Sequence, residues 1–298
     1  MKILIIGSNG FIGQHCSNFF TNVSGTSVYG ADITASDKPN YFQLDSSNTN
    51  FNTLFQNNQF DVCINCSGSA NVGFSFENPD IDFELNVLNV QKILVALKNF
   101  NSNCKFINFS SAAVYGNPEM LPILENAASK PLSPYGFHKL QSELLLTEYH
   151  NFFGLQTCSL RVFSAYGPGL SKQLFWDLFQ KVSASTTITL FGTGNETRDF
   201  IYIDDLIQII RLIIEKGDFQ GTTYNVASSV ETTIGDAVTI FRDEFAPNNT
   251  IVFNGKAKLG DPNNWCADIS KIEALGFKNK VSITEGIKKY IAWIKELE

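Results

Sequence analysis

Five short apolar runs alternate with longer amphipathic segments in the first half of the chain, and this alternation restricts the possible folds most strongly. The runs cover residues 2–6, 26–31, 61–65, 105–109 and 156–163. Runs that are apolar throughout are typical of strands covered on both faces, as in a parallel sheet. Between them, Asp80–Phe100 and Tyr135–Phe153 have the periodicity and length of crossover helices. The pattern predicts an α/β fold with a doubly wound parallel sheet.

The regular alternation ends after Phe163, where the segment SAYGPGLS contains glycine and proline and reads as a loop. We therefore predict a main domain over 1–165 and a smaller cap over 166–298. A helix at Ile203–Lys216 and a strand at 222–227 are expected to return to the sheet, so part of the segment 200–228 belongs to the main domain. The remaining pieces, including a helix at Ile283–Leu297, are assigned to the cap.

Composition excludes several classes of protein. The chain has 298 residues and a net charge of -7, so no basic stripe is available for duplex nucleic acid. No apolar run approaches the length of a membrane span, and the opening MKILIIG is too short for a signal peptide. The six cysteines are scattered through apolar runs, which favours a reducing cytoplasm over a disulfide framework. Cys63 and Cys66 are interpreted as strand-end residues, and no metal site is predicted.

A glycine-rich turn follows the first apolar run directly. Its segment GSNGFIG opens a predicted helix, where glycine permits a tight turn and the helix N-terminus offers amide donors to a pyrophosphate. Asp32 follows nineteen positions after the last of these glycines, where a carboxylate can bind ribose hydroxyls. It repels a 2′-phosphate, so NAD is favoured over NADP. The alternative is a plain strand-helix turn. The residues expected to bind the cofactor here are Gly7, Asn9, Gly10, Phe11, Ile12 and Gly13.

Tyr135 and Lys139 lie four residues apart in SPYGFHKLQSELL, on one face of a predicted helix. A fixed cation near a phenol favours the phenolate and lowers the phenol pKa, as proton transfer at an alcohol or ketone requires. We therefore expect Lys139 to lower the pKa of Tyr135. The alternative is a core tyrosine beside a surface lysine.

These two motifs, with several longer segments, resemble the extended short-chain dehydrogenase/reductase family, which includes nucleotide-sugar epimerases, dehydratases and ketoreductases. The resemblance extends over nearly the whole length and implies a Rossmann domain with a substrate-binding cap. It is carried by FSSAAVYG (109–116), SPYGFHK (133–139), LRVFSAYGPG (160–169), LFGTGNETRDFIYIDDL (190–206), TTYNVAS (222–228) and LGDPNNWCADISK (259–271).

The resemblance implies a catalytic set of Ser111, Tyr135 and Lys139. Ser111 would donate a hydrogen bond to the reacting sugar oxygen, and Tyr135 would exchange a proton with it. Lys139 would hold the nicotinamide ribose, so that Tyr135 and Lys139 also count as cofactor contacts. On the cofactor side, Asp45 resembles the family's adenine contact and Asn86 the asparagine near the nicotinamide. Ser67 lies in INCSGSA, where small residues let the backbone pass the cofactor.

The substrate side would take a nucleotide diphosphate sugar. Arg198 resembles the arginine that binds the diphosphate, and an ion pair with Asp199 or Glu196 is its structural alternative. Lys258 stands where many relatives have a second arginine, and Ser164 replaces a common asparagine. Lys172 is assigned with Gln173, Phe175 and Trp176 to a cap helix above the sugar, with packing as the expected role of both aromatics.

The set of reactive side chains limits the reactions that the chain is expected to catalyse. Ala112 and Ala113 occupy the positions where dehydratases of the family have an acidic pair, and Ala113 stands where 3,5-epimerising reductases have a cysteine, so those reactions are not expected. Oxidation and reduction at one carbon remain. Asp32 favours a 4-epimerase that retains NAD, whereas the modest length favours a 4-ketoreductase with exogenous reduced cofactor. A non-catalytic dinucleotide sensor is the alternative from another class. A cytoplasmic homodimer paired through the two long helices is expected.

Overall fold

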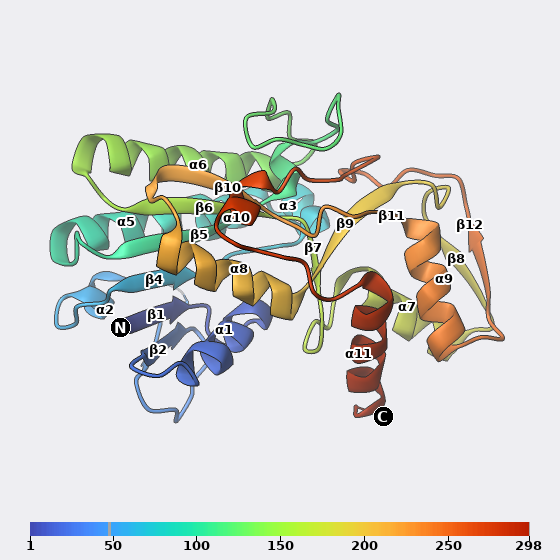
Figure 1. The fold of residues 1–298 in the computed structure, drawn as a ribbon, viewed down its shortest axis with the longest axis horizontal. Coiled ribbons are helices and arrows are strands. Elements are labelled where there is room, and N and C mark those ends of the chain that lie inside the picture. The colour runs from blue at the N-terminus through green and yellow to red at the C-terminus, as the bar shows by residue number, and fades with distance from the viewer. Residues whose placement is uncertain (47–48, 298) are drawn as a thin grey trace.

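The computed structural model describes residues 1–46 and 49–297, and its central feature is a seven-stranded sheet (Figure 1). Every neighbouring pair of strands in this sheet is parallel, in the order β10-β6-β5-β4-β1-β2-β3. The strands are β1 (Lys2–Ile6), β2 (Ser27–Asp32), β3 (Tyr41–Gln43), β4 (Val62–Asn65), β5 (Lys105–Ser111), β6 (Thr157–Val162) and β10 (Gln220–Val226). The predicted parallel α/β sheet is therefore confirmed.

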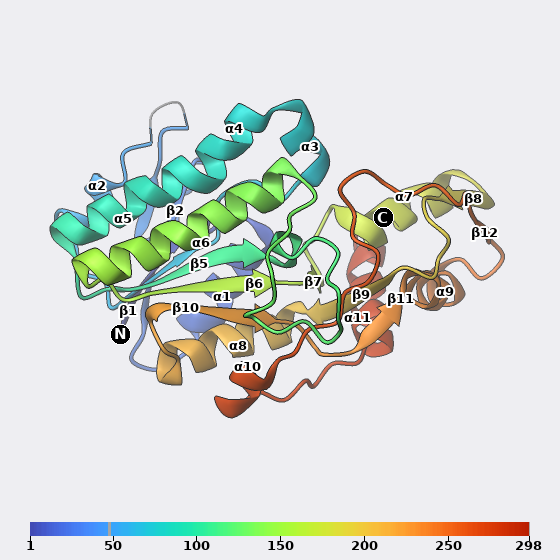
Figure 2. The ribbon, with the colours of Figure 1, turned by 90° about the horizontal axis from the view of Figure 1, so that it is seen from above.

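Helices cover both faces of the sheet because its strands are apolar on both sides. In β1, Ile3 and Ile5 pack into one core cluster with residues of α1 (Phe11–Thr21) and α8 (Ile203–Lys216). Leu4 and Ile6 point to the opposite face and pack with residues of α2, α5 and α6. Figure 2 shows α5 and α6 side by side over that face. The helices of this second layer are α2 (Asn52–Phe55), α5 (Asn89–Phe100) and α6 (Pro134–Phe153).

The predicted elements agree with the structure to within a few residues, with two informative differences. The short strand β3 is not among the apolar runs of the sequence, because three residues give no readable alternation. The helix expected over Asp80–Phe100 is divided into α4 (Pro79–Phe83), the π-helical turn η1 (Glu84–Leu88) and α5. α3 (Val72–Glu77) precedes them. A π turn shifts the side-chain register by one residue, and such turns are frequent at functional sites.

A smaller region of short strands and helices lies at one end of the sheet (Figure 1). Its strands form a three-stranded sheet, β11-β9-β7, and a pair, β12-β8. Phe175 packs there against the rings of Tyr166, Phe200, Phe241 and Tyr290. The elements are β7 (Ser164–Tyr166), α7 (Gln173–Ala184), β8 (Thr187–Leu190), β9 (Thr197–Tyr202), β11 (Glu231–Thr233), α9 (Ile234–Phe245), β12 (Thr250–Phe253) and α11 (Ile283–Lys295). The short helix α10 (Ser270–Ala274) packs instead against β10 and α8 of the main sheet.

The expected return of the chain to the main sheet is confirmed, since β10 pairs with β6 and α8 packs into the core beneath. The boundary between 165 and 166 stays a prediction. Within the described part of the chain, no helix combines the length and the apolar character that crossing a membrane requires.

Candidate active site

The glycine turn joins β1 to α1 at the carboxyl edge of the sheet. Gly7 has a φ of +78°, a conformation that favours glycine. A Cβ on Gly13 would lie 2.1 Å from the Gly7 carbonyl oxygen, so the helix can begin this close to the turn only without a side chain. Gly10 is the N-cap of α1, and no side chain among the described residues caps it. The first amides of α1, in the Phe11–Ile12 turn, therefore suit a phosphate group.

Asp32 lies at the end of β2 and is fixed against this turn. One carboxylate oxygen accepts a hydrogen bond from the Asn9 amide at 2.9 Å, and the other accepts one from the Thr34 amide at 3.3 Å. The Asn9 side chain donates to the Tyr41 hydroxyl at 2.9 Å, and this hydroxyl donates to the Thr34 carbonyl. Burial, followed by the charge of Asp32, raises the pKa of Tyr41. Tyr41 had not been predicted as a site residue.

Asp45 lies on an exposed part of the chain just beyond β3. Its carbonyl oxygen accepts a hydrogen bond from the Thr49 hydroxyl at 2.8 Å. Its place after the edge strand agrees with the segment expected to pass the adenine, and its contact with a cofactor stays a prediction.

Tyr135 and Lys139 lie on the buried face of α6, near its N-terminus. Ser133 caps this helix by accepting a hydrogen bond from the Gly136 amide at 3.1 Å, and Pro134 occupies the first turn. Both side chains of the pair are buried, at 7% and 6% exposure. The reading of Lys139 as a surface lysine is therefore wrong.

The pair faces the end of β5, which carries Ser111. The Lys139 ammonium donates to the Phe109 carbonyl at 2.9 Å and lies 5.8 Å from the centre of the Tyr135 ring. Ser111 ends the strand and accepts a hydrogen bond from the Ala113 amide at 3.1 Å, which starts the 3₁₀ turn η2 (Ala112–Val114). The Ser111 hydroxyl is close enough to hydrogen-bond with the Tyr135 phenol and to act on its pKa. The three residues expected to act together are thus brought together.

The expected lowering of the tyrosine pKa is not found. Burial raises the pKa of Tyr135 to about 12, the Ser111 hydrogen bond acts to lower it, and the charge of Asp82 raises it further. Burial also lowers the pKa of Lys139 to about 8, against the opposing effect of Asp82 and Glu143. Desolvation is the largest effect on both pKa values, because the two side chains lie on one buried face of the helix.

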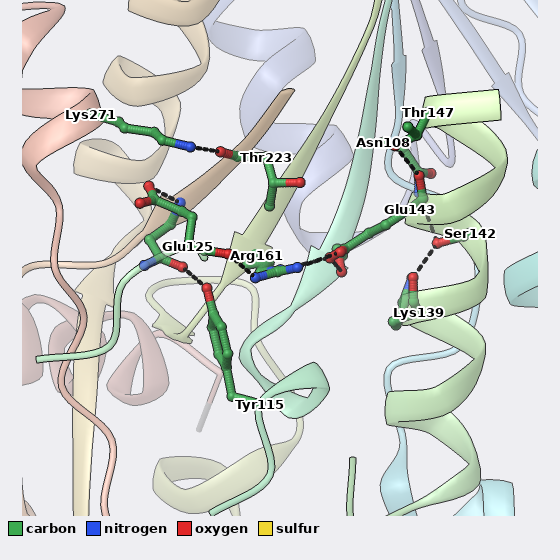
Figure 3. Close-up of polar contacts among 12 residues, drawn as sticks. Asn108, Tyr115, Glu125, Lys139, Ser142, Glu143, Thr147, Arg161, Thr223 and Lys271 are labelled. Atoms are coloured by element: carbon green, nitrogen blue, oxygen red, sulfur yellow. Dashed lines mark hydrogen bonds and ion pairs between the residues drawn. The ribbon is translucent and has the colours of Figure 1, made fainter. Parts of the chain in front are cut away.

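A buried polar network supports the pair from the next turns of α6 (Figure 3). Glu143, four residues after Lys139, binds Arg161 of β6 through two hydrogen bonds of 2.7 and 2.9 Å, and it accepts a third from Ser110. The Arg161 guanidinium lies 4.7 Å from the centre of the Tyr115 ring. These residues were not predicted. The sequence did contain a signal for Glu143, because it follows Lys139 by the same four-residue spacing that separates Lys139 from Tyr135.

A second chain of polar contacts connects α6 to β4 across β5. The Ser67 hydroxyl donates to the Asn65 side chain at 2.5 Å, and Asn65 donates to Asn108 at 2.8 Å. Asn108 donates to Ser142 at 3.3 Å, and the Ser142 hydroxyl donates to the Lys139 carbonyl at 2.7 Å. Ser67, predicted near the cofactor, is therefore fixed relative to α6.

Asn86 lies in the π turn and is 1% exposed, yet neither polar atom of its side chain has a hydrogen-bond partner among the described residues. A Cβ on Gly68 would lie 2.6 Å from its Oδ1, so the amide reaches the backbone that follows β4. Buried polar atoms are rarely unpaired in proteins. An orphaned amide, the turn at Gly7 and the carboxylate of Asp32 together fit a dinucleotide along this edge.

Arg198 lies on β9 of the smaller region. Its guanidinium donates hydrogen bonds to the Thr197 carbonyl at 2.8 Å and to the Asn263 carbonyl at 3.3 Å. It lies 3.8 Å from the Asp261 carboxylate and packs over the Trp265 ring. Burial lowers its pKa, against the opposing charges of Asp261 and Glu196.

The ion pairs considered for Arg198 are not the ones found. Asp199 accepts hydrogen bonds from the amides of Ser228, Ser229 and Ala267, and Glu196 accepts from Thr193 and Gly194. Both carboxylates cap loops of the backbone. The carboxylate that stands closest to the guanidinium is that of Asp261.

The other residues assigned to the substrate side are less firmly held. Lys258 lies in an exposed loop, and Lys172 is the exposed N-cap of α7. Ser164 begins β7 and is half-buried. Phe175 is buried in the aromatic cluster, whereas Trp176 is half-buried against Phe179 and Trp293. No cluster of metal-ligating side chains is found among residues 1–46 and 49–297.

Comparison with known proteins agrees with this geometry. The model of a family described as NAD dependent epimerase/dehydratase matches residues 3–227. A putative UDP-glucose 4-epimerase of Methanocaldococcus jannaschii is 27% identical over 98% of both chains. A UDP-glucuronate 4-epimerase of Thermodesulfobacterium geofontis is 26% identical over 98% of this chain and 96% of its own. The crystal structure of a Bacillus cereus UDP-glucuronic acid 4-epimerase with UDP-glucuronic acid and NAD superposes with a TM-score of 0.91, at 29% identity and full coverage of both chains.

Proposed function

The chain belongs to the NAD-dependent epimerase/dehydratase family, and from that membership and the site we propose that it is a 4-epimerase of a nucleotide diphosphate sugar that uses NAD. One observation carries this proposal. Tyr135, Lys139 and Ser111 gather at the carboxyl edge of the sheet, on the same edge as the glycine turn and Asp32. This is where open α/β sheets bind dinucleotides and their substrates.

Each residue has a role that its surroundings support. The amides of Phe11 and Ile12 would bind the pyrophosphate of the cofactor, Asp32 its ribose hydroxyls, and Asn86 the nicotinamide side. Bound NAD would supply the hydride exchange at a sugar carbon.

The proton is handled by the chain itself. Tyr135 would move a proton to and from the hydroxyl oxygen of that carbon, and Ser111 would donate a hydrogen bond to the same oxygen. Because burial raises the pKa of Tyr135 to about 12, the phenol has to lose its proton before it can accept one from the sugar hydroxyl, and the Lys139 cation would stabilise the phenolate that accepts it.

Dehydration has no support in the site. Ala112 and Ala113 follow Ser111 in η2, and neither side chain can transfer a proton. Ser111, Tyr135 and Lys139 therefore suffice for reversible oxidation and reduction at one carbon, whereas dehydration would need a further acid or base.

For the substrate, we favour a uridine diphosphate sugar. The 4-epimerase relatives act on this class, and Arg198 offers a cation at the edge of the smaller region that can bind a diphosphate. Ser164, Lys172 and Lys258 would complete this side.

For the assembly, we favour a cytoplasmic homodimer formed by α5 and α6. Apolar side chains are exposed on the outer faces of these adjacent helices, including Val95, Phe137, Leu144 and Phe152. Light scattering on a sizing column should give twice the chain mass, and Leu144→Glu should give the mass of one chain. Met120→Glu, at an exposed loop position outside α5 and α6, serves as the control and should leave the dimer intact.

The reaction can be tested on the purified protein with UDP-glucose, UDP-glucuronate and UDP-N-acetylglucosamine. The expected result is conversion of one of them to its C4 epimer with catalytic NAD, read by chromatography of the nucleotide sugars. Conversion of a 4-keto sugar with stoichiometric consumption of reduced cofactor would instead identify a 4-ketoreductase. Binding of NAD without turnover of any nucleotide sugar would favour a sensor.

A further inference from the structure

Asp82 is a carboxylate shielded from solvent, and it lies beside the helix that carries the reactive pair. It belongs to α4, which packs against α6 (Figure 2). Its side chain is 0% exposed. One oxygen is 2.6 Å from Nδ1 of His138, and the other has no hydrogen-bond partner within the described part of the chain. A buried carboxylate with one unpaired oxygen is costly, so packing alone does not account for this residue.

His138 holds this carboxylate from within the reactive segment itself. It directly precedes Lys139 and follows Tyr135 by three residues, so that it lies on the same turn of α6. Its side chain is 12% exposed, and its ring packs edge-on against Phe83, the neighbour of Asp82, with the ring centres 5.4 Å apart. One short polar contact and one aromatic contact therefore fix α4 to the turn that presents Tyr135 and Lys139.

The position of this carboxylate has an electrostatic consequence for both members of the pair. Burial lowers the pKa of Lys139, and the charge of Asp82 is the largest effect in the opposite direction, followed by that of Glu143. Burial raises the pKa of Tyr135, and the charge of Asp82 adds to that rise. Asp82 therefore favours the ammonium of Lys139 and the phenol of Tyr135, the two protonated forms.

Few other charged groups face this turn. Glu143 faces Lys139 from the same helix, and Arg161 of β6 binds it bidentately. From β5 the Ser111 hydroxyl faces Tyr135. On α4 and η1, the carboxylates of Asp80 and Glu84 are exposed, as is Glu77 of α3. Asp82 is thus a buried negative charge close to the pair with a histidine as its partner, distinct from these solvated ones.

We propose that Asp82 and His138 are positioning residues for the proton-transfer pair: the imidazole holds the buried carboxylate in place, and the carboxylate lies beside the turn of α6 that presents Tyr135 and Lys139. The inference rests on the proposed function for its catalytic meaning. The effect of the Asp82 charge on the pKa of Lys139 is a property of the protein alone and can be measured without a substrate.

The test is a pH titration of Lys139 by NMR, in protein labelled with carbon-13 at the lysine Cε positions, with Lys139→Met used to assign the resonance. In the parent protein the pKa of Lys139 is expected at about 8. In Asp82→Asn the midpoint should fall by about one pH unit, because a neutral amide no longer favours the cation. Asp80→Asn removes the same charge from an exposed position of the same helix and should leave the midpoint unchanged.

Equal midpoints in the parent and Asp82→Asn would overturn the proposal. If Asp82→Asn does not fold, His138→Gln provides a second measurement: glutamine can still donate to the carboxylate but cannot carry a proton, so the midpoint should stay or rise, and a fall would overturn the proposal. In the epimerase assay, Asp82→Asn should also move the pH profile toward lower pH, whereas a purely structural role would reduce the rate equally at every pH. If the parent protein epimerises none of the nucleotide sugars, the proposed function is contradicted, whereas the titration of Lys139 is still a valid test of the electrostatic effect.

Discussion

The two sides of the candidate site differ in how firmly their side chains are held. On the sheet side, Asp32 accepts two backbone amides, Lys139 donates to a strand carbonyl, and Glu143 binds Arg161 through two hydrogen bonds. In the smaller region, Arg198 is held by two carbonyls, while Lys172 and Lys258 are exposed. The sheet side is therefore ordered before any ligand binds, whereas the other side combines one fixed cation, Arg198, with two exposed ones.

The two sides nevertheless meet. A Cβ on Gly260, in the loop of Lys258, would lie 2.7 Å from Val72 of α3 and 3.6 Å from Ser133 at the start of α6. This loop thus contacts the helix that carries Tyr135. The comparison predicts that substitutions on the sheet side damage chemistry or folding, and that substitutions on the other side weaken substrate binding.

The largest effect is expected for Tyr135→Phe. Loss of the phenol that faces Ser111 should reduce turnover by about 10²- to 10⁴-fold, the usual contribution of a general acid or base. The measurement is the initial rate of C4 epimerisation at saturating substrate. Tyr149→Phe, at the other end of the same helix, removes a hydroxyl from an equally buried ring and should retain the parent rate. Comparable losses in both variants would mean that packing of α6, and not proton transfer, had been disturbed.

The next largest effect concerns folding and tests the ordered side directly. Arg161→Met should lower the free energy of unfolding by about 3–5 kcal/mol, because it leaves the buried carboxylate of Glu143 without its partner. Denaturant unfolding followed by circular dichroism gives the value. The matched control is Arg211→Met, which breaks an exposed pair with Glu215 and should cost less than about 0.5 kcal/mol. If the two variants are equally stable, the buried network does not order the site.

The fold was largely predictable from the sequence because its signals are repeated and local. A strand covered on both faces is buried along its length, and β1, β4 and β5 are buried at every position except at the end residues of β1 and β5. The glycine turn was equally readable, since a Cβ at Gly13 would collide with Gly7. Strand β3 and the π turn gave no such signal, because each occupies only three to five residues, too few to show a hydrophobic period.

The catalytic set was predictable in position but not in electrostatic state. The spacing of Tyr135 and Lys139 places them on one face, and the structure confirms that they lie together. Their pKa values depend on how deeply that face is buried and on Asp82, which comes from a helix more than fifty residues earlier in the chain. The spacing of two residues within one helix indicates neither the burial of that face nor the presence of Asp82. The same holds for Arg198, whose neighbour Asp261 belongs to a distant loop.

A smaller effect, confined to binding, is expected for Arg198→Ala. Loss of charge-assisted hydrogen bonds to a diphosphate is worth about 1.5–3 kcal/mol, which corresponds to a rise of about 10- to 100-fold in the KM of the nucleotide sugar with kcat little changed. Arg198→Lys should fall between the parent and the alanine variant, because lysine retains the charge and loses the planar fork. A fall in kcat with KM unchanged would place this residue with the chemistry and break the distinction between the two sides.

The smallest effects are expected for Lys258→Ala and Lys172→Ala, and they decide how far the comparison holds. Both side chains are exposed, so each charge acts on a bound diphosphate through solvent and should contribute no more than about 1 kcal/mol, or about fivefold in KM. The contribution should also shrink as salt is raised, since exposed charges are screened over about 10 Å at 0.1 M ionic strength. Steady-state kinetics at low and high salt measures both quantities. An effect of Lys258→Ala as large as that of Arg198→Ala, and insensitive to salt, would mean that the loop against α3 closes over the substrate and becomes as ordered as the sheet side.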